Sequence, residues 1–399
     1  MSQIELYSYD SKEDYFDYNS QVIQEEREEH ESKENITYYP VKVQYYHHYK
    51  MYYLVIPKEY LDELDYLREN KMDIFAKGKI LTFTSKNGYN RHFSFDAVID
   101  SSEEDLDNPE IVYAYLVPIK EKYRYSRNLI GNYRVKERSG DLTYERMENA
   151  LDEFVNGECC SENLEEYILG YDINYRRNFN HIFNYRRSYP LNIRNYFRIY
   201  KYQLNKIDRI FHKEMNTIKI SSRTPQSIIG FIIYAIYQMR KSIYDKILVC
   251  SSSNSSADSI ALELLKLKEN VENLNLLRIY AKNQELIKRH KSLDEISYHK
   301  LIKKDYDRNN FFGGRNKLVE DNDIIISTCV NSYCDEIINY DFPFVIIVDA
   351  NNSNENENLI PITLQAKHIV LIANEESDSG DDNLYKRMKY LYPENHIEL

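Results

Sequence analysis

The residues with the clearest capacity for chemistry follow a buried strand and open a buried helix. Thr217–Met239, TIKISSRTPQSIIGFIIYAIYQM, predicts a strand, a turn and an apolar helix, and Lys246–Asp258, KILVCSSSNSSAD, predicts a second strand and turn. Such a turn binds phosphate when glycines aim consecutive backbone N–H groups at the anion and a lysine neutralises its charge. The turn here, Ser222–Ile229 (SRTPQSII), holds neither residue type. The sequence therefore predicts a phosphate-loop position without the residues that bind phosphate.

This turn has a structural explanation that needs no ligand. Thr224 is a good helix N-cap and Pro225 is a good first helical residue, so we expect the helix to start by itself. The alternative is a residual anion site, in which Arg223 or Lys219 meets an anion at the N-terminus of this helix.

A second candidate for chemistry is a basic, aromatic segment. Residues 175–213 carry ten basic and one acidic side chain, although the whole chain has a net charge of −12. Arg176-Arg177 and Arg186-Arg187 each follow a tyrosine. Arginine and tyrosine together can hold phosphates and stack on bases, so this segment is a candidate for binding single-stranded RNA. The alternative is a solvated helical face that pairs with the acidic residues 1–40, which contain eleven acidic and three basic side chains.

From Leu191 onward, apolar runs alternate with helical segments, and this alternation positions the candidate residues. The pattern is typical of a parallel α/β sheet, in which functional residues sit at the carboxyl ends of strands. The predicted strands are Thr217–Ile220, Ile247–Cys250, Leu276–Ile279, Ile324–Ser327, Val345–Asp349 and Ile369–Ala373.

The chain before this sheet divides into three parts by its periodicity. Residues 1–35 are acidic and predict a solvated stalk helix over Gln21–Glu34. Residues 36–118 hold five short β-branched or aromatic runs, with a tight turn at Asn87-Gly88, and predict a small antiparallel barrel. Residues 119–190 are polar and predict helices, one with its apolar face at Tyr144, Met147, Leu151 and Phe154. Residues 191–399 form the α/β part.

The composition excludes several classes of protein. A chain of 399 residues with 42% hydrophobic and 29% charged residues is globular and large enough for two or three domains. The five cysteines lack CxxC spacing, so we expect free thiols in a reducing compartment. The N-terminus has no signal-peptide pattern, and the longest apolar run, Ile228–Tyr237, is about half a membrane span. We therefore expect a cytoplasmic protein without a membrane segment.

The order of these segments resembles the first RecA-like lobe of superfamily 1 helicases, and most closely the up-frameshift RNA helicases of nonsense-mediated mRNA decay. Lys246–Asp258 is similar to the family's motif Ia, Asp323–Val330 (DIIISTCV) to motif Ic and Phe344–Asp349 (FVIIVD) to the Walker B strand. Pro361–Ile372 resembles the approach to motif III. The resemblance implies a P-loop NTPase fold with an inserted barrel called 1B, a helical insertion called 1C over Ser139–Asp172, and a stalk.

The catalytic positions depart from the family pattern. The family's phosphate loop, GPPGTGKT, falls without gaps on Ser222, Arg223, Thr224, Pro225, Gln226, Ser227, Ile228 and Ile229. Isoleucines therefore stand where the family has its phosphate-binding lysine and magnesium-binding threonine. The Walker B Asp-Glu becomes Asp349-Ala350. The family's cofactors are ATP and magnesium, but these losses imply that this chain uses neither. Asp349 is then either a relic metal ligand or a strand-end carboxylate held by hydrogen bonds.

The resemblance also implies RNA contacts. Ser253, Asn254 and Thr328 match family positions that touch RNA phosphates, although serine and asparagine are also ordinary turn residues. We expect a degenerate helicase-like protein without ATPase activity, which acts as an RNA-binding or protein-interaction module. A protein partner would dock on the stalk or on the exposed lobe. The alternative is one half of a split ATP-dependent RNA helicase, completed by a second RecA lobe on another chain.

Overall fold

The computed structural model divides the chain into two units. Unit 1 comprises Met1–Gln24, Leu142–Tyr280 and His290–Leu399, and unit 2 comprises Glu25–Asp141 and Ala281–Arg289. The residues that the structure describes are 8–34, 38–46, 51–57, 80–87, 91–104, 111–118, 129–137, 141–171, 183, 197, 199–222, 224–225, 227–269, 271, 273–281, 284–287, 289–307, 314–374 and 383–399.

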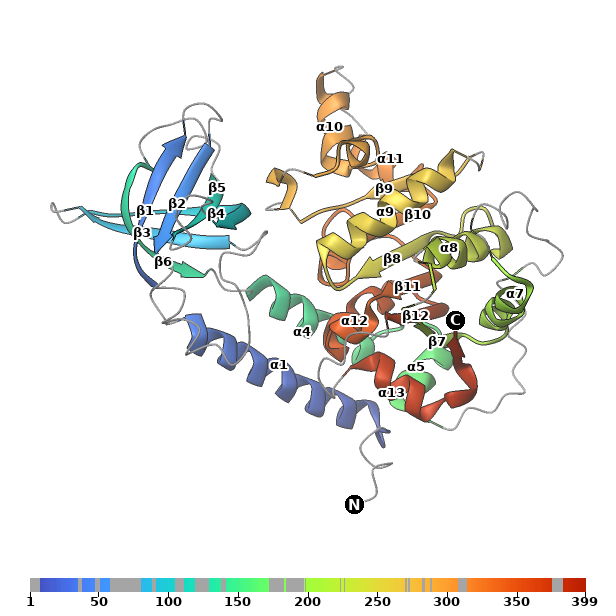
Figure 1. Ribbon diagram of the computed structural model, residues 1–399. Helices are drawn as coiled ribbons and strands as arrows, with labels where there is room; N and C mark the ends of the chain where they lie inside the picture. The colour runs from blue at the N-terminus through green and yellow to red at the C-terminus, as the bar shows by residue number, and fades with distance from the viewer. Residues whose placement is uncertain are drawn as a thin grey trace. The chain divides into compact units, whose positions relative to one another are not determined.

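Unit 1 is built on a seven-stranded parallel sheet (Figure 1). The order across the sheet is β13-β7-β12-β11-β8-β10-β9, and every neighbouring pair is parallel. The six predicted strands are confirmed, and a short edge strand at the end of the chain adds a seventh. The strands are β7 (Met215–Ile220), β8 (Ile247–Ser251), β9 (Leu276–Arg278), β10 (Ile324–Thr328), β11 (Phe344–Val348), β12 (His368–Asn374) and β13 (His396–Glu398).

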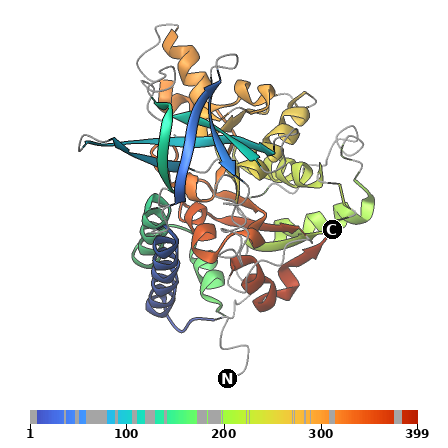
Figure 2. The same ribbon diagram turned by 60° about the vertical axis from the view of Figure 1, so that its left-hand side comes forward.

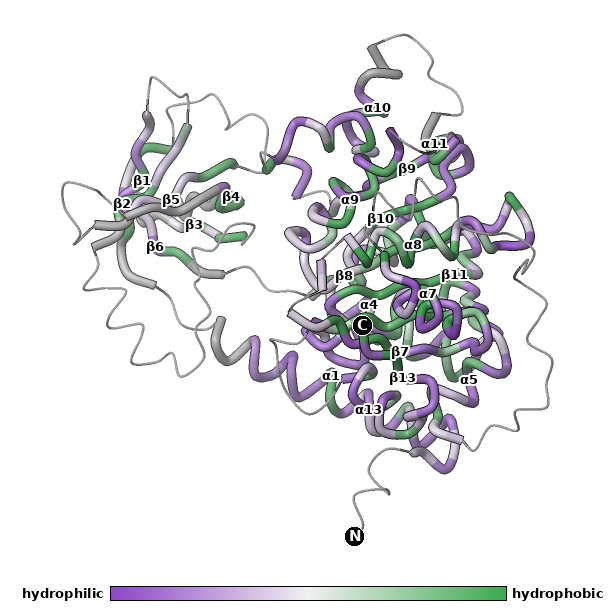
Figure 3. The backbone as a smooth tube through the Cα atoms, turned by 45° about the vertical axis from the view of Figure 1, so that its right-hand side comes forward, coloured by the Kyte–Doolittle hydropathy of each residue, from purple (hydrophilic) through white to green (hydrophobic). Residues whose placement is uncertain are grey.

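Both faces of this sheet are covered by helices, which explains why its strands are apolar throughout. The strands are mostly green, hydrophobic, in Figure 3. One face packs against α7 (Lys201–Ile207), α8 (Ser227–Met239) and α9 (Asn254–Lys268). The other face packs against α4 (Asp141–Asn156), α5 (Glu162–Leu169), α12 (Glu355–Ile362) and α13 (Leu384–Leu391). Unit 1 also contains α10 (Tyr298–Asp307) and α11 (Gly314–Glu320).

The helical segment after the barrel forms as its periodicity predicts. The four apolar residues of the predicted helical face are all buried on α4. Helix α5 begins at the N-cap Ser161 and ends at Gly170, whose φ of 84° is a left-handed conformation that glycine adopts without a Cβ penalty.

The acidic segment forms the long helix α1 (Lys12–Glu34), which confirms and extends the predicted stalk helix. Its first half packs beside α4, where the Tyr15 and Phe154 ring centroids lie 5.1 Å apart (Figure 2). The Tyr15 hydroxyl is buried and donates to Glu355 Oε1 at 2.9 Å. Arg387 Nε donates to Glu355 Oε2 at 2.9 Å, and Arg387 Nη2 donates to the carbonyl of Ile168 at 2.6 Å. One buried ion pair therefore links α1, α5, α12 and α13.

Unit 2 is a closed antiparallel barrel in the order β1-β2-β5-β4-β3-β6. Its strands are β1 (Tyr38–Tyr46), β2 (Met51–Pro57), β3 (Ile80–Asn87), β4 (Arg91–Glu104), β5 (Ile111–Pro118) and β6 (Gly131–Glu137). The five predicted strands are present. The expectation of helix throughout 119–190 is wrong at Gly131–Glu137, because this segment pairs with both β1 and β3 and closes the barrel. The alternation of charged and apolar residues in this short segment predicts a strand only once its partner strands are known.

His368 is fully buried at the start of β12. Its Nε2 bonds to the carbonyl of Ile210 at 2.9 Å, and the Phe183 ring packs against it at 4.9 Å between centroids. Burial disfavours the charged imidazolium and lowers the pKa of His368 to about 4. The folded chain therefore holds a neutral histidine in the core.

We expect Arg387→Met to lower the free energy of unfolding by about 3–5 kcal/mol, because it leaves the Glu355 carboxylate buried without its cation. Lys12→Met is the matched control: it breaks the Lys12–Glu165 pair, whose side chains are 26% and 27% exposed, and should cost about 0–1 kcal/mol. Urea unfolding followed by circular dichroism measures both. Equal losses would show that the buried pair does not fasten α1 to unit 1.

We expect His368 to make the protein less stable as the pH falls. The unfolded histidine takes up its proton near pH 6.5, whereas the folded one resists protonation until about pH 4. The stability difference is therefore constant above pH 6.5 and declines by about 3 kcal/mol from pH 6.5 to pH 4. His368→Gln should remove that part of the decline in urea unfolding measured across this range. An unchanged pH dependence in the variant would contradict the prediction.

Candidate functional site

A cavity of about 240 Å³ lies at the carboxyl ends of β8, β11 and β12. The neighbouring strands β8 and β11 lead into α9 and α12, which pack on opposite faces of the sheet. A crevice opens where neighbouring parallel strands send the chain to opposite faces, and ligands of α/β sheets bind there. Its lining residues come from α8, α9, β11 and β12 and from the turns that join them: Ile229, Gly230, Ser253, Ser255, Ser256, Ser259, Ile260, Glu263, Val348, Asp349 and Asn374.

Asp349 directly follows β11 and lines this cavity, and both of its carboxylate oxygens accept hydrogen bonds. Ser256 Oγ donates to Oδ2, and Asn374 Nδ2 donates to Oδ1. The backbone of Asp349 is left-handed, at φ 56° and ψ 36°, a conformation that aspartate tolerates better than most residues. The carboxylate thus ties the ends of β11 and β12 to the first turn of α9.

The two isoleucines of the predicted phosphate loop are buried. Ile228 is 1% exposed and Ile229 is 7% exposed, and both belong to the hydrophobic cluster beneath α8. Ser222 and Pro225 are exposed, and Thr224 and Ser227 are half-buried. Arg223 and Gln226 lie outside the described residues. A lysine at position 228 would have its ammonium in an apolar environment, which strongly disfavours its charge.

The turn that precedes α8 differs from the prediction in one respect. The helix begins at Ser227, so Thr224 and Pro225 are turn residues and not its N-cap and first residue. The Thr224 N–H donates to the carbonyl of Ser221 at 2.9 Å, and the Ile228 N–H donates to the carbonyl of Pro225 at 3.0 Å. These bonds close two successive turns with backbone groups alone, which satisfies donors that a phosphate loop would present to its ligand.

The charge of the cavity opposes a polyphosphate. Asp349 and Glu263 contribute carboxylates, whereas the lining residues that the structure describes include neither lysine nor arginine. Gly230 lets α8 lie close to Glu263 of α9 and to Phe197, since an added Cβ would lie 3.2 Å from Glu263 Cγ and 3.2 Å from the Phe197 ring. Glu263 is paired with Lys266, whose Nζ lies 3.2 Å from its Oε2.

The predicted RNA-contact residues of the β8 turn are occupied within the fold. Ser253 is the N-cap of α9, and its side chain accepts from the Ser256 N–H at 3.2 Å. Asn254 Oδ1 accepts from Arg278 Nη2 at 2.9 Å. Thr328 is half-buried one strand away, and its Oγ1 accepts from the Asn331 N–H at 3.4 Å. Arg186 and Arg187 lie outside the described residues.

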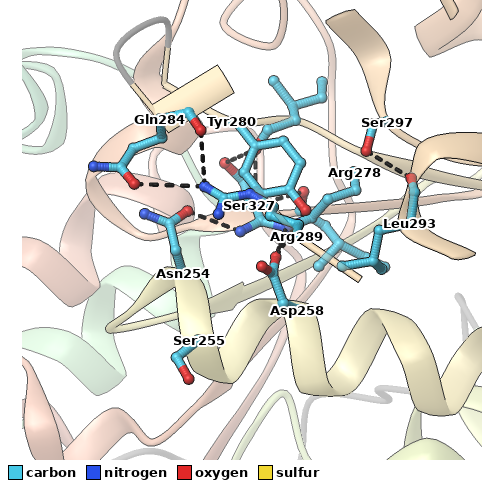
Figure 4. A network of polar contacts seen from close by, with 12 residues as sticks. Asn254, Ser255, Asp258, Arg278, Tyr280, Gln284, Arg289, Leu293, Ser297 and Ser327 are labelled. Carbon is cyan, nitrogen blue, oxygen red and sulfur yellow. Dashed lines mark hydrogen bonds and ion pairs between the residues drawn. The ribbon is translucent and has the colours of Figure 1, made fainter. Parts of the chain in front are cut away.

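Arg278 organises these strand ends, and the sequence analysis missed it. Its side chain is fully buried at the end of β9, where it also donates from Nε to Asp258 Oδ1 at 3.0 Å and packs 4.0 Å from the Tyr280 ring centroid (Figure 4). Tyr280 donates to the same Asp258 oxygen at 2.9 Å. A lone arginine inside the apolar run Leu276–Ile279 was the available signal.

Among the described residues, no three histidine, cysteine, aspartate or glutamate side chains gather as a metal site. Within the same part of the chain, every helix is too short or too polar to traverse a bilayer. The five cysteines are free, and Cys250 and Cys329 are buried as small residues at strand ends.

Comparison with known proteins gives the relationship of the chain. A family model described as an AAA domain matches residues 298–373. ATP-dependent helicase NAM7 of Saccharomyces cerevisiae is 23% identical over 259 residues, which cover 59% of this chain and 25% of that protein. Regulator of nonsense transcripts 1 of Dictyostelium discoideum is 22% identical over 61% of this chain and 20% of its own length. ATP-dependent helicase upf1 of Schizosaccharomyces pombe is 22% identical over 81% of this chain and 36% of its own length.

These matches, together with the parallel sheet and the barrel, relate the chain to the up-frameshift superfamily 1 helicases. The chain spans between 20% and 36% of the length of these three relatives. Among solved structures, the Hef helicase domain of Pyrococcus furiosus is similar over 43% of this chain and 37% of that one, with 13% identity and a TM-score of 0.18, too low to support an argument.

We expect Ser256→Ala to lower the free energy of unfolding by about 1.5–3 kcal/mol, because it removes a hydrogen bond to the Asp349 carboxylate. Ser255→Ala is the matched control on the same turn of α9. Ser255 is exposed, so its replacement should change stability by about 0.5 kcal/mol or less. Thermal and urea unfolding compare the two variants. Indistinguishable stabilities would contradict a structural role for the Asp349 carboxylate.

Proposed function

We propose that the chain is a helicase-like module that neither binds nor hydrolyses ATP and that acts by binding single-stranded RNA or a protein partner. The similarity to a protein named regulator of nonsense transcripts 1 supports a place in mRNA surveillance, for which we propose the cytoplasm as the location. The observation that carries the proposal is the burial of Ile228 and Ile229 at the positions of the phosphate-binding lysine and magnesium-binding threonine.

The rest of the crevice supports this proposal. The helicase family that the sequence resembles has a second acid after the Walker B aspartate, and Ala350 occupies that position as a fully buried core residue. Asp349 would have to hold magnesium alone while its oxygens accept from Ser256 and Asn374. In P-loop NTPases a serine or threonine of the loop helps to hold the magnesium ion, and Ile229 stands at that position here without an oxygen ligand.

The binding role rests on what persists around the lost site. The fold retains the sheet, the barrel and the stalk helix, and the described residues that line the cavity include no lysine or arginine to hold a phosphate group there. RNA would therefore bind elsewhere, for which the basic segment with Arg186 and Arg187 is one candidate from the sequence. A protein partner would use the stalk helix α1 or the exposed surface of unit 1.

We expect the purified chain to leave a fluorescent ATP analogue unbound at micromolar concentration and to release no phosphate from ATP with Mg²⁺. The double variant Ile228→Lys with Ile229→Thr should not restore either activity, because the lysine would be buried. It should also lower the free energy of unfolding in urea by about 3–5 kcal/mol. Fluorescence polarisation and a phosphate-release assay measure these outcomes, with an active P-loop ATPase as the positive control.

Two results would overturn this account of the site. Saturable binding of the analogue by the wild-type chain would mean that the crevice still accepts a nucleotide. Hydrolysis that appears only when a second polypeptide is added would instead favour the split helicase, in which another chain completes the active site.

A further inference from the structure

The outer surface of the barrel carries aromatic and aliphatic side chains over three neighbouring strands. Side chains alternate along a strand, and those of Val43, Leu54 and Ala114 are buried inside the barrel. Their sequence neighbours on β1, β2 and β5 therefore face outward. We call the apolar and aromatic members of this outward set the tyrosine face, which consists of Tyr46, Met51, Tyr53, Val55, Tyr113 and Tyr115.

Tyr53 lies at the centre of the tyrosine face. Its ring centroid is 6.3 Å from that of Tyr46 on β1, and 5.7 Å and 6.5 Å from those of Tyr113 and Tyr115 on β5. The Tyr53 hydroxyl donates to Gln44 Oε1 at 2.6 Å, which holds the central ring in place. The three strands therefore present one continuous aromatic surface.

The barrel core does not account for these rings. Its interior is already filled by side chains that include Phe83, Phe95 and Tyr133. The rings of the tyrosine face remain partly accessible, and Tyr46 is 46% exposed. In an antiparallel sheet with one solvated face, such positions are usually polar. An accessible aromatic patch of this kind is typical of an interaction surface.

The rings meet at steep angles, which bears on the kind of ligand that fits. The Tyr53 ring plane is inclined by 76° to that of Tyr46, by 74° to that of Tyr113 and by 45° to that of Tyr115. In edge-to-face packing, the edge of one ring covers the flat face of another. The central rings are also half-buried. The tyrosine face thus offers upright ring edges more than the open flat faces on which nucleic-acid bases stack.

Positive charge borders the tyrosine face. Lys42 is exposed on β1, where it pairs with Val55 of the face and, on its other side, with Asn132 of β6. Arg134 is exposed two residues beyond Asn132, on the same side of the barrel wall. These cations attract carboxylates, so they favour a ligand that carries an acidic residue beside its apolar part.

We propose that the tyrosine face binds a proline-rich peptide segment of a partner protein, with an acidic residue of that segment beside Lys42 and Arg134. The inference rests on the protein-binding role proposed above, and it names a site on the barrel and the chemistry of the partner. Proline-rich segments form extended polyproline helices, and the domains that recognise them present surfaces lined by aromatic side chains. Because such a segment is extended before it binds, it loses little conformational entropy.

The dimensions of the tyrosine face fit such a segment. A polyproline helix repeats every three residues, or about 9.3 Å, and neighbouring strands lie about 4.8 Å apart, so β1 and β5 are separated by about 9.6 Å across β2. Two prolines three residues apart can therefore contact β1 and β5 on either side of Tyr53. The carbonyl groups of a polyproline helix have no internal hydrogen bonds, and tyrosine hydroxyls can donate to them.

Binding of the labelled full chain to an array of synthetic decapeptides tests the inference. Every peptide of the first set carries Pro-x-x-Pro followed by two glutamates, with the remaining positions varied. A second set replaces the prolines with alanine, and a third replaces the glutamates with lysine. The wild-type chain should bind members of the first set and none of the second. It should bind the matching members of the third set about 3-fold to 10-fold more weakly, because like charges then face each other.

Fluorescence polarisation with the tightest peptide measures the variants. Tyr53→Ala should weaken binding about 30-fold, the usual effect of removing a central aromatic residue, whereas Tyr53→Phe keeps the ring and should weaken it about 5-fold or less. Lys42→Glu with Arg134→Glu should reverse the charge preference, so that the lysine peptide binds more tightly than the glutamate peptide. The matched control Lys241→Glu alters an exposed lysine of unit 1 and should change neither result.

The outcomes separate this inference from the proposed function. A wild-type chain that binds no peptide of the first set would overturn the inference, as would a charge-reversed variant that still prefers glutamate. If Tyr53→Ala abolishes binding of a single-stranded RNA and no peptide binds, the face belongs to RNA: the inference fails and the proposed function stands. Hydrolysis of ATP by a chain that binds the peptides would overturn the proposed function alone. Circular dichroism of each variant confirms that the barrel is folded.

Discussion

The burial of helix α8 is the constraint on which the rest of the α/β unit depends. Ten of its thirteen residues are buried, of which Ile228 is the first and Met239 the last. They pack in one hydrophobic cluster with the sheet and with α9. Fully burying one isoleucine stabilises a fold by about 1.5–3 kcal/mol, so the first turn of this helix contributes to stability where a nucleotide-binding protein would keep it for its ligand. A phosphate loop keeps its polar groups facing an anion. The proposed loss of phosphate binding rests on this contrast.

The polar residues around the crevice bond to one another. Whether or not a ligand binds, the ends of parallel strands present polar groups that must be satisfied. Asp349 accepts from Ser256 and Asn374, and Ser253 caps α9. Arg278, although fully buried, is matched by Asp258 and by carbonyl oxygens. Groups that could have faced a ligand are thus engaged with one another.

The sequence was informative where a pattern is local and repeated. Apolar runs located all six predicted strands of the sheet, and helical periodicity identified the buried face of α4. It was less informative where a partner distant in sequence decides the structure. Strand β6 became evident only through its pairing with β1 and β3, and the bonds of Asp349 come from residues 93 and 25 positions away. The position of the crevice was predictable from strand ends, whereas the partners of its carboxylate were not.

Amide hydrogen exchange across α8, with and without saturating ATP and Mg²⁺, tests most directly whether the start of this helix belongs to the core and not to a nucleotide site. Core helices exchange through global unfolding, whereas ligand-binding loops open locally. The account predicts that the amides of Phe231–Ile236 exchange slowly and at a rate that ATP does not change. It also predicts that the Ile228 amide, bonded to Pro225, is unaffected by ATP. Rapid exchange at the start of α8 that slows when ATP is added would contradict it.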